Sequence, residues 1–313
     1  MAELKDTAIR LYRKYFGSPT AAEDQAVGVE TVLTGEQAVA LSEIAMSQTL
    51  VLSGGLDEVE AGLNAFGRPV STMDAEGARG AIAATMGLGL SGKRATVFVD
   101  GQQIAGAQDL LYTVAGRHLP LVVHLTNKAV SSHGGASGTG HEGFHLSAET
   151  GCFTLFAANV QEAVDFTYIA RRVAEQCLVP GIVAMDAEQT AASPQNVHLL
   201  APSQVRKYIG PADGIVTVPT VAQRLLFGRQ RRRVPRWHDV DRPALQGALF
   251  DRDSFALGAL GRQTFFDEFL AECLTDSLER FGRLTGRHYS LVSGYRLDNA
   301  DTVFVVQGSA IAT

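Results

Sequence analysis

Polar residues that could do chemistry follow predicted strands at several places in this chain of 313 residues. The carboxylate Glu76 stands at the head of a helix of small residues, Gly77 to Leu90. A polar segment, 100–103, and a long polar loop, 126–140, each follow an apolar run that is typical of a buried strand. Ligands of parallel sheets bind at the carboxyl ends of the strands. We therefore expect a binding site where these segments meet.

The loop itself allows two further chemistries. The spacing of His141 and His145 would place both rings on one face of a helix, which could suit zinc, but no third ligand is fixed by the sequence. The glycines of 134–140 could present backbone N–H groups to a phosphate, although they lack the spacing of a phosphate-binding loop. We interpret this glycine-rich segment as a mobile lid over a site.

The elements that must position these residues alternate between helix and strand. Continuous apolar strands between helices predict a parallel sheet covered on both faces. The predicted order is helix 34–48 with Thr34 as N-cap, strand 49–52, helix 57–66, strand 70–73, helix 77–90, strand 95–99, a helix to 115, strand 119–125, helix 145–150, strand 152–156, helix 160–175 and strand 181–185. At least five strands indicate a doubly wound, mostly parallel α/β domain that closes near residue 195.

The segments on either side of this domain lack its regular alternation of helix and strand. Residues 1–33 predict an amphipathic helix and a polar connector. Residues 196–313 are punctuated by prolines and predict an extended arm, with a helix over 267–284. An apolar run at 302–306 predicts one more strand, as if a further α/β element began there or a partner's sheet were completed. The expected division is therefore 1–33, 34–195 and 196–313.

Composition excludes several classes of protein. The formal net charge of −6 argues against nucleic acid as the main partner, so the basic run from Arg229 to Arg236 is interpreted as a subunit contact or a solvated arm. No apolar run is long enough to span a membrane, and the N-terminus has no secretory signal pattern, so a cytoplasmic location is expected.

The three cysteines are far apart in sequence and form no CxxC pair. They cannot hold a tetracysteine iron–sulfur cluster within this chain, and each is expected to be a small buried residue. Iron–sulfur electron transfer, if any, belongs to another chain or domain.

Three stretches resemble one known family: MDAEGARGAIAATMGLGLSG, GRHLPLVVHLTNKAVSSH and GHEGFHLSAETGCFTLFAANVQEAVDF. They are similar to the pyrimidine-binding domain of the pyruvate:ferredoxin (2-oxo acid:ferredoxin) oxidoreductases, which bind thiamine diphosphate. Residues 34–195 carry this resemblance, and 196–313 look like the arm and linker that follow in those enzymes. Only the first 33 residues lie outside it.

The resemblance implies roles for six residues. Glu76 would contact the aminopyrimidine ring of thiamine diphosphate and share a proton with it, which requires a carboxyl group. Gln102 and Gln103 would face the cofactor, although the family's Ser-Gln-Gly pattern is replaced here by Asp100-Gly-Gln-Gln. The substrate pocket would be lined by Ser53, Lys128 and His141.

Two departures concern the substrate carboxylate. The family has a threonine between two prolines after its first strand, where this chain has Ser53-Gly-Gly, and it has an arginine where this chain has Lys128. Lysine keeps the positive charge but loses the two-pronged hydrogen bonding of a guanidinium. We expect a different 2-oxo acid, a weaker site or no substrate.

The chain also lacks the GDG…N motif that binds magnesium and diphosphate in this family. Thiamine diphosphate would thus lie at an interface, with magnesium and the iron–sulfur clusters held by a partner in an oligomer. The expected function is a subunit or fragment that oxidises a 2-oxo acid, with coenzyme A as a possible co-substrate. The alternatives are a non-catalytic structural or regulatory subunit, or half of a split non-oxidative thiamine diphosphate enzyme.

Overall fold

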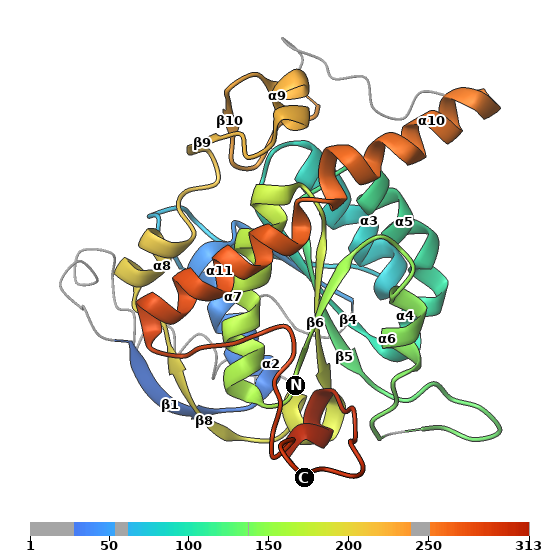
Figure 1. The fold of residues 1–313 in the computed structure, drawn as a ribbon, viewed down its shortest axis with the longest axis vertical. Coiled ribbons are helices and arrows are strands. Elements are labelled where there is room, and N and C mark those ends of the chain that lie inside the picture. The colour runs from blue at the N-terminus through green and yellow to red at the C-terminus, as the bar shows by residue number, and fades with distance from the viewer. Residues whose placement is uncertain (1–27, 54–61, 137, 239–250, 313) are drawn as a thin grey trace.

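The computed structural model describes residues 28–53, 62–136, 138–238 and 251–312. Its centre is a six-stranded parallel sheet in the order β3-β2-β4-β5-β7-β6 (Figure 1). The strands are β2 (Thr49–Leu52), β3 (Ser71–Asp74), β4 (Ala95–Asp100), β5 (Val122–Asn127), β6 (Phe153–Ala157) and β7 (Gly181–Asp186). The chain moves outward from β2 to β3 and then returns to β4 on the other side of β2. This reversal confirms the doubly wound α/β fold, and it lies between β2 and β4.

Helices cover both faces of this sheet (Figure 1). One face packs on α2 (Gly35–Met46) and α7 (Val160–Cys177), with α11 (Leu270–Thr285) outside α7. The other face packs on α3 (Gly77–Leu90), α5 (Gln108–Gly116) and α6 (Glu142–Ser147). The central strands are buried on both sides, which is why their sequences are apolar throughout rather than alternating.

Local signals explain where the helices begin. Thr34 and Gln37 form a capping box at the head of α2, in which the Gln37 N–H donates to Thr34 Oγ1 at 3.3 Å and the Thr34 N–H donates to Gln37 Oε1 at 3.1 Å. Asn159 caps α7 by accepting from the Glu162 N–H at 2.9 Å. The helix predicted at 77–90 has the same bounds in the structure.

Two predictions near the N-terminus were wrong in the described residues. The end of the connector expected in 1–33 is strand β1 (Val29–Leu33), which pairs antiparallel with β8 (Gln195–Leu199); residues 1–27, with the expected helix, lie outside the described residues. The helix expected over 57–66 falls partly on residues 54–61, which are also outside, and residues 62–66 are not helical. There the Asn64 side chain accepts the N–H groups of Phe66 and Arg68, which stabilises a turn instead.

The strand predicted at 302–306 was also wrong. Its hydrophobic side chains are exposed, with Val305 at 96%, and the following residues form the short helix η4 (Gly308–Ala312). A strand needs a partner to satisfy its backbone, and this segment pairs with no strand among the described residues. Helix α6, expected over 145–150, begins three residues earlier than its sequence suggested.

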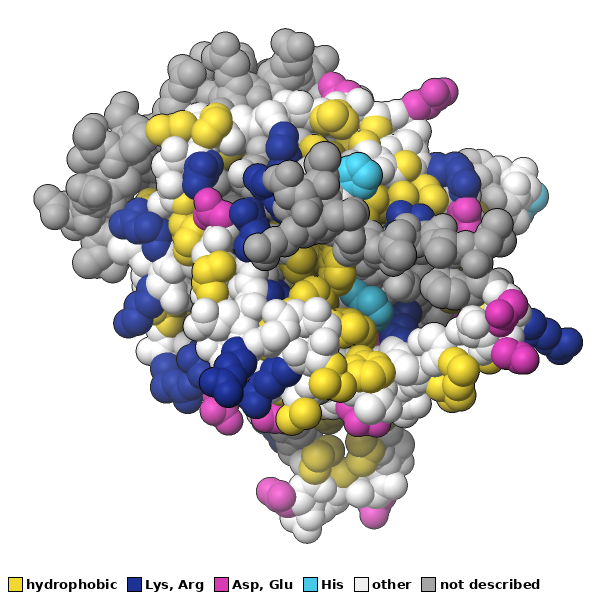
Figure 2. Space-filling view, turned by 90° about the horizontal axis from the view of Figure 1, so that it is seen from above, with side chains coloured by type: hydrophobic (Ala, Val, Ile, Leu, Met, Phe, Trp, Pro, Cys, Tyr) yellow, Lys and Arg dark blue, Asp and Glu magenta, His cyan; other side chains and the backbone are white. Residues whose placement is uncertain are grey.

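The arm is more ordered than its prolines suggested. It contains β8, α8 (Pro202–Tyr208), β9 (Ile215–Thr217), α9 (Val221–Phe227), β10 (Gln230–Arg232) and α10 (Arg252–Arg262) before the predicted helix, which is α11. Figure 2, seen from the end of the molecule where α9 and β10 lie, shows Lys and Arg side chains gathered over one half of that face. Arg231 of the basic run is not solvated: it is buried and donates to the carbonyls of Glu175 and Gln176 at the end of α7.

All three cysteines are buried, as predicted. Of the helices described here, none combines the length and hydropathy that a transmembrane span needs.

A network of buried charges ties α2 to α7 and the sheet. Arg171 Nη2 lies 3.1 and 3.2 Å from the two carboxylate oxygens of Glu43, and all of these side chains are buried. His124 Nε2 lies 2.8 Å from Glu43 Oε1, and the Ser47 hydroxyl donates to Oε2. Burial alone would raise the pKa of Glu43, but the Arg171 charge and the hydrogen bonds from His124 and Ser47 outweigh it and lower the pKa to about 2.

This lowered pKa predicts acid sensitivity. A carboxyl with a lower pKa in the folded chain stabilises the fold above its unfolded pKa, near 4.5, and loses that contribution as the pH falls toward 2. We expect about 2 kcal/mol of the free energy of unfolding to be lost between pH 6 and pH 3 through Glu43. Urea unfolding at both pH values measures this. The variant Glu43→Gln should lose less than the native chain over that interval, and an equal loss in both would contradict the assignment.

Candidate functional site

The polar residues of the candidate site lie at the carboxyl edge of the sheet, the lower end in Figure 1. The register brings their strands together: Leu52 lies opposite Phe98, Asp100 opposite Thr126, and Asn127 opposite Asp186. Ser53, directly after β2, is half-buried and its N–H donates to the Phe98 carbonyl at 3.2 Å. Ser53 thus sits at the point where the chain reverses direction across the sheet.

Glu76 occupies the N-cap position of α3, just after β3. Its side chain is exposed and makes no capping hydrogen bond to the helix. The next residue, Gly77, has a φ of +64°, a conformation that side chains with a Cβ rarely adopt, so the chain turns sharply between strand and helix here. The Glu76 carboxylate thus makes no hydrogen bond to α3 and is exposed at this edge of the sheet.

The two glutamines after β4 have different surroundings, although both are exposed. Gln103 lies beside the head of α3, with its Oε1 about 4.0 Å from where a Cβ of Gly77 would stand. The Gln102 amide instead donates to the carbonyls of Ala129 and Ala136, each at 2.8 Å. Gln102 therefore anchors the polar loop, while Gln103 is the glutamine that is near Glu76.

Lys128 is paired within the chain. Its Nζ lies 3.0 Å from Asp100 Oδ2, with the two side chains 38% and 31% exposed. An anion that approached Lys128 would have to compete with the Asp100 carboxylate for this charge.

Glu36, in the first turn of α2, interacts with the Lys128–Asp100 pair. It was not predicted as a site residue, because its place in the sequence indicates only the start of a helix. Thr126 Oγ1 lies 3.4 Å from Glu36 Oε1. Burial raises the pKa of Glu36, and the Asp100 charge adds to the effect, whereas Lys128 and the Thr126 hydrogen bond oppose it. No local sequence pattern indicates this contact, because Glu36 and β5 are far apart in sequence and come together only in the folded chain.

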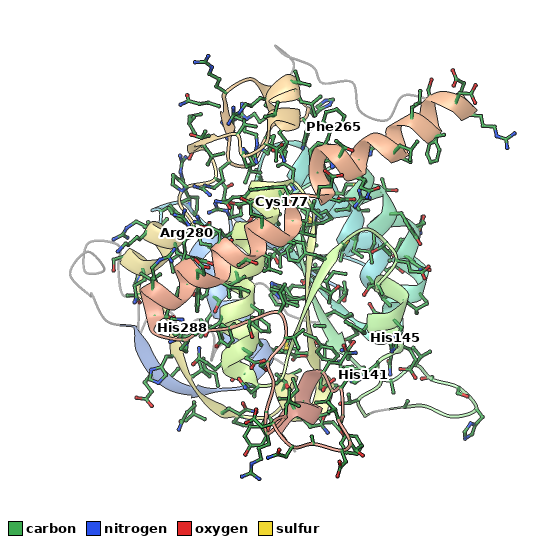
Figure 3. All side chains as sticks on the ribbon, in the orientation of Figure 1. His141, His145, Cys177, Phe265, Arg280 and His288 are labelled. Atoms are coloured by element: carbon green, nitrogen blue, oxygen red, sulfur yellow. The ribbon has the colours of Figure 1, made fainter. Side chains whose placement is uncertain are left out.

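His141 pairs with a different carboxylate, that of Asp186 at the end of β7. Its Nε2 is 2.9 Å from Asp186 Oδ1, and the other Asp186 oxygen accepts from the Ser309 N–H at 2.9 Å and its hydroxyl. Figure 3 shows His141 near the C-terminal segment and His145 on the outer side. His145 is exposed and packs edge-on against Phe144, so the two histidines do not form one site. Asp186 was also missed, although it directly follows an apolar strand.

Close backbone contacts hold α6 and the loop against β4. A Cβ on Gly101 would stand 2.9 Å from the Lys128 carbonyl oxygen, and a Cβ on Gly143 would stand 2.6 Å from Gly101 Cα. Only glycine fits at such distances, because real side chains do not approach backbone this closely. These two glycines set the distance between the segments that carry Gln102, Lys128 and His141.

The edge fits the pyrimidine end of thiamine diphosphate rather than its diphosphate end. It offers the carboxylate of Glu76, which has no hydrogen-bond partner among the described residues, with Gln103 beside it. The buried amide of Asn127, at the end of β5, also has no hydrogen-bond partner among the described residues, and such a group needs water or a ligand. In the described part of the chain, His, Cys, Asp and Glu form no group of three that could hold a metal ion.

The fold of this chain, a parallel sheet with helices on both faces, is also found among solved α/β proteins. It is similar, with a TM-score of 0.50, to a solved 2-oxoglutarate:ferredoxin oxidoreductase from Magnetococcus marinus, at 14% identity over 75% of this chain and 44% of that one. Residues 56–227 match the family model "Pyruvate flavodoxin/ferredoxin oxidoreductase, thiamine diP-bdg", where the last words abbreviate thiamine diphosphate-binding. The chain belongs to this family, which confirms the resemblance seen in the sequence.

Full-length relatives are much longer. The chain is 26% identical over 294 residues to the pyruvate-flavodoxin oxidoreductase of Nostoc sp., and the match covers 90% of this chain and 23% of the relative. It is 25% identical over 250 residues to the probable pyruvate-flavodoxin oxidoreductase of Escherichia coli, and this match covers 80% of this chain and 20% of the relative. A match to the mitochondrial pyruvate dehydrogenase [NADP(+)] of Euglena gracilis, at 22% identity, covers 90% of this chain and 15% of that relative. The chain thus spans less than a quarter of each of these relatives.

Proposed function

We propose that this chain supplies the pyrimidine-binding half of a thiamine diphosphate site in an enzyme that oxidises a 2-oxo acid. The observation that carries the proposal is the position of Glu76: an unpaired carboxylate at the carboxyl edge of a sheet of this family, beside Gln103. The diphosphate and magnesium would be held by another domain or subunit, together with iron–sulfur clusters. Exposure of Glu76 in the isolated chain supports a site that is completed at an interface.

Bound thiamine diphosphate supplies the nucleophilic carbon that attacks the carbonyl of a 2-oxo acid. Glu76 would hydrogen-bond the pyrimidine ring nitrogen and share a proton with it. Lys128 would attract the substrate carboxylate, and Ser53 and His141 would line the pocket. Asp186 would orient the His141 ring through its 2.9 Å hydrogen bond.

The proposal is tested by purifying the tagged full chain from its native cells without oxygen. Reduction of a dye is then measured with pyruvate and with 2-oxoglutarate. Co-purification of a chain that holds the diphosphate motif and clusters, with turnover that needs added thiamine diphosphate, is the expected result. A partner without clusters and turnover without dye reduction would instead indicate half of a non-oxidative enzyme.

A non-catalytic subunit is the second candidate, and one observation favours it. Lys128 stands where the family has an arginine, and here its charge is already paired with Asp100. Loss of both the guanidinium and the free charge would weaken any carboxylate site. A stable complex without turnover on any 2-oxo acid would support this reading.

Under the proposed function, the ion pair between Asp100 and Lys128 predicts how a substitution of Asp100 changes substrate binding. Asp100→Asn keeps the side-chain shape but removes the charge that competes for Lys128. Because partly exposed pairs contribute less than about 1 kcal/mol, we expect the KM for the 2-oxo acid to fall by about two- to fivefold. Steady-state kinetics of the complex measure this, with Asp109→Asn as a control at an exposed pair elsewhere. A KM that stays equal or rises would contradict the competition.

A further inference from the structure

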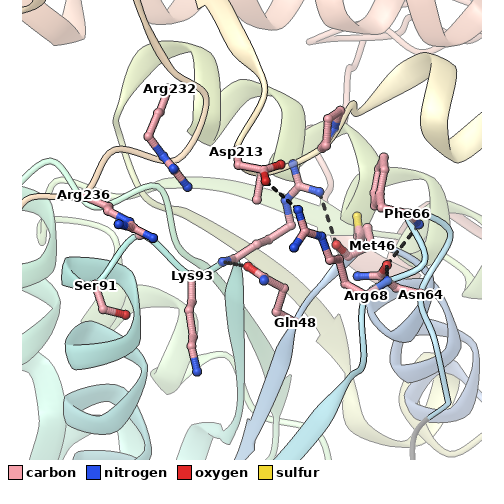
Figure 4. A pocket seen from close by; sticks show the side chains of 14 residues that line it. Met46, Gln48, Asn64, Phe66, Arg68, Ser91, Lys93, Asp213, Arg232 and Arg236 are labelled. Atoms are coloured by element: carbon pink, nitrogen blue, oxygen red, sulfur yellow. Dashed lines mark hydrogen bonds and ion pairs between the residues drawn. The ribbon is translucent and has the colours of Figure 1, made fainter.

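A cavity of about 320 Å³ lies at the amino edge of the sheet, opposite the candidate site. Five separate segments form its wall: 46–48, 64–68, 91–94, 211–213 and 232–236 (Figure 4). Its volume is near the lower limit for small-molecule sites, about 300–1,000 Å³. This size suits a small molecule.

The wall carries more positive than negative charge. Five of its side chains are cationic, and two of these are paired: Arg68 with Asp213 at 2.6 Å and the buried Arg94 with Glu175 at 2.6 Å. The other three, Lys93, Arg232 and Arg236, have no carboxylate partner among the described residues.

The two arginines of the arm lie on one side of the cavity. Figure 4 shows Arg232 and Arg236 reaching from the arm into the same region, opposite Arg68 and Asp213. Arg232 makes only a 3.5 Å contact, from its Nε to the Val234 carbonyl. Two guanidinium groups that face one space repel each other unless an anion lies between them.

The remaining polar group is also a donor. Gln48 is fixed because its Oε1 accepts the Arg94 N–H at 3.0 Å, so its amide N–H₂ is left for the cavity. Met46 and Phe66 supply an apolar part of the wall. Donors and cations gathered against a small apolar surface suit an organic anion.

We propose that this cavity binds a small metabolite that carries two phosphate groups. Two arginines that face one space, with Lys93 elsewhere on the wall, suit a ligand with two phosphate groups, since each phosphate group contributes about −1.5 to −2 at neutral pH. Guanidinium groups pair with phosphate oxygens in a two-pronged geometry that lysine lacks. The apolar wall would contact the organic part of the ligand. The site lies at the opposite edge of the sheet from Glu76 and is independent of the proposed function.

The test uses inorganic pyrophosphate with the full chain, by calorimetry and by the fluorescence of Trp237, the single tryptophan, which follows Arg236. We expect saturable binding that weakens as salt rises and is tighter than that of orthophosphate or of citrate, which has similar charge. Arg232→Gln with Arg236→Gln should weaken it at least about tenfold.

The matched control is Arg224→Gln with Arg229→Gln, which removes the same charge from exposed positions of the same arm. It should leave binding within about twofold, because screened surface charge contributes little. Glu76→Gln should also leave binding unchanged, since it lies at the other edge. Should the first pair fail to fold, Arg236→Gln alone gives the same comparison. No binding, equal binding of citrate, or equal weakening in the control pair would overturn the proposal.

Discussion

Arg171→Met is expected to destabilise this protein by about 3–5 kcal/mol, because it leaves the Glu43 carboxylate buried without its main counter-charge. In the native chain Arg171 also donates to the carbonyls of Ala95 and Pro120, so these hydrogen bonds would be lost as well. Urea unfolding at pH 7, followed by circular dichroism, measures the change in free energy of unfolding.

The double variant Glu43→Leu with Arg171→Met separates charge from packing. Because it removes both members of the pair, it should recover a large part of the lost stability. Arg280→Met removes an arginine from an exposed pair on α11 and should change stability by less than about 1 kcal/mol. A loss in Arg171→Met no larger than that of Arg280→Met would contradict the role of the network.

Glu76→Gln is expected to lower turnover of the assembled complex by about 100- to 10,000-fold under the proposed function. Glutamine keeps the size and can still accept a hydrogen bond, but it cannot hold the proton that the ring nitrogen shares. Dye reduction at saturating 2-oxo acid measures the rate, and calorimetry with thiamine diphosphate measures binding.

Glu149→Gln is the matched control, since Glu149 is also exposed but lies before β6, at the other edge of the sheet. It should leave turnover unchanged. Equal rates in the native chain and in Glu76→Gln would show that Glu76 takes no part in the reaction. If the complex is intact, this result would also favour a non-catalytic subunit.

The parallel sheet could be predicted because its signals are local. Buried strands are continuous apolar runs, and the capping box of Thr34 fixes the start of α2 within a few residues. The errors have a different origin: β1 and the run at 302–306 depend on whether a distant strand offers an edge. Val29–Leu33 finds one in β8, whereas the apolar run near the C-terminus finds none among the described residues.

The candidate site was predictable only in part for the same reason. Strand ends identify Ser53, Lys128 and the glutamines as neighbours of one edge. Pairings across the fold were not visible: Asp100 with Lys128, Glu36 with Thr126, and Asp186 with His141 join residues from different elements.

The β1–β8 ribbon has a consequence for how this domain can be cut. It joins residues just before α2 to residues just after β7, so a recombinant domain spanning 34–195 would lose β1 and most of β8. Keeping β8 without β1 would expose the backbone of Gln195–Leu199 and the buried side chains of Val197 and Leu199. An unpaired strand edge of this kind promotes aggregation. A recombinant domain should therefore contain both strands of the ribbon, from Val29 through Leu199 at least.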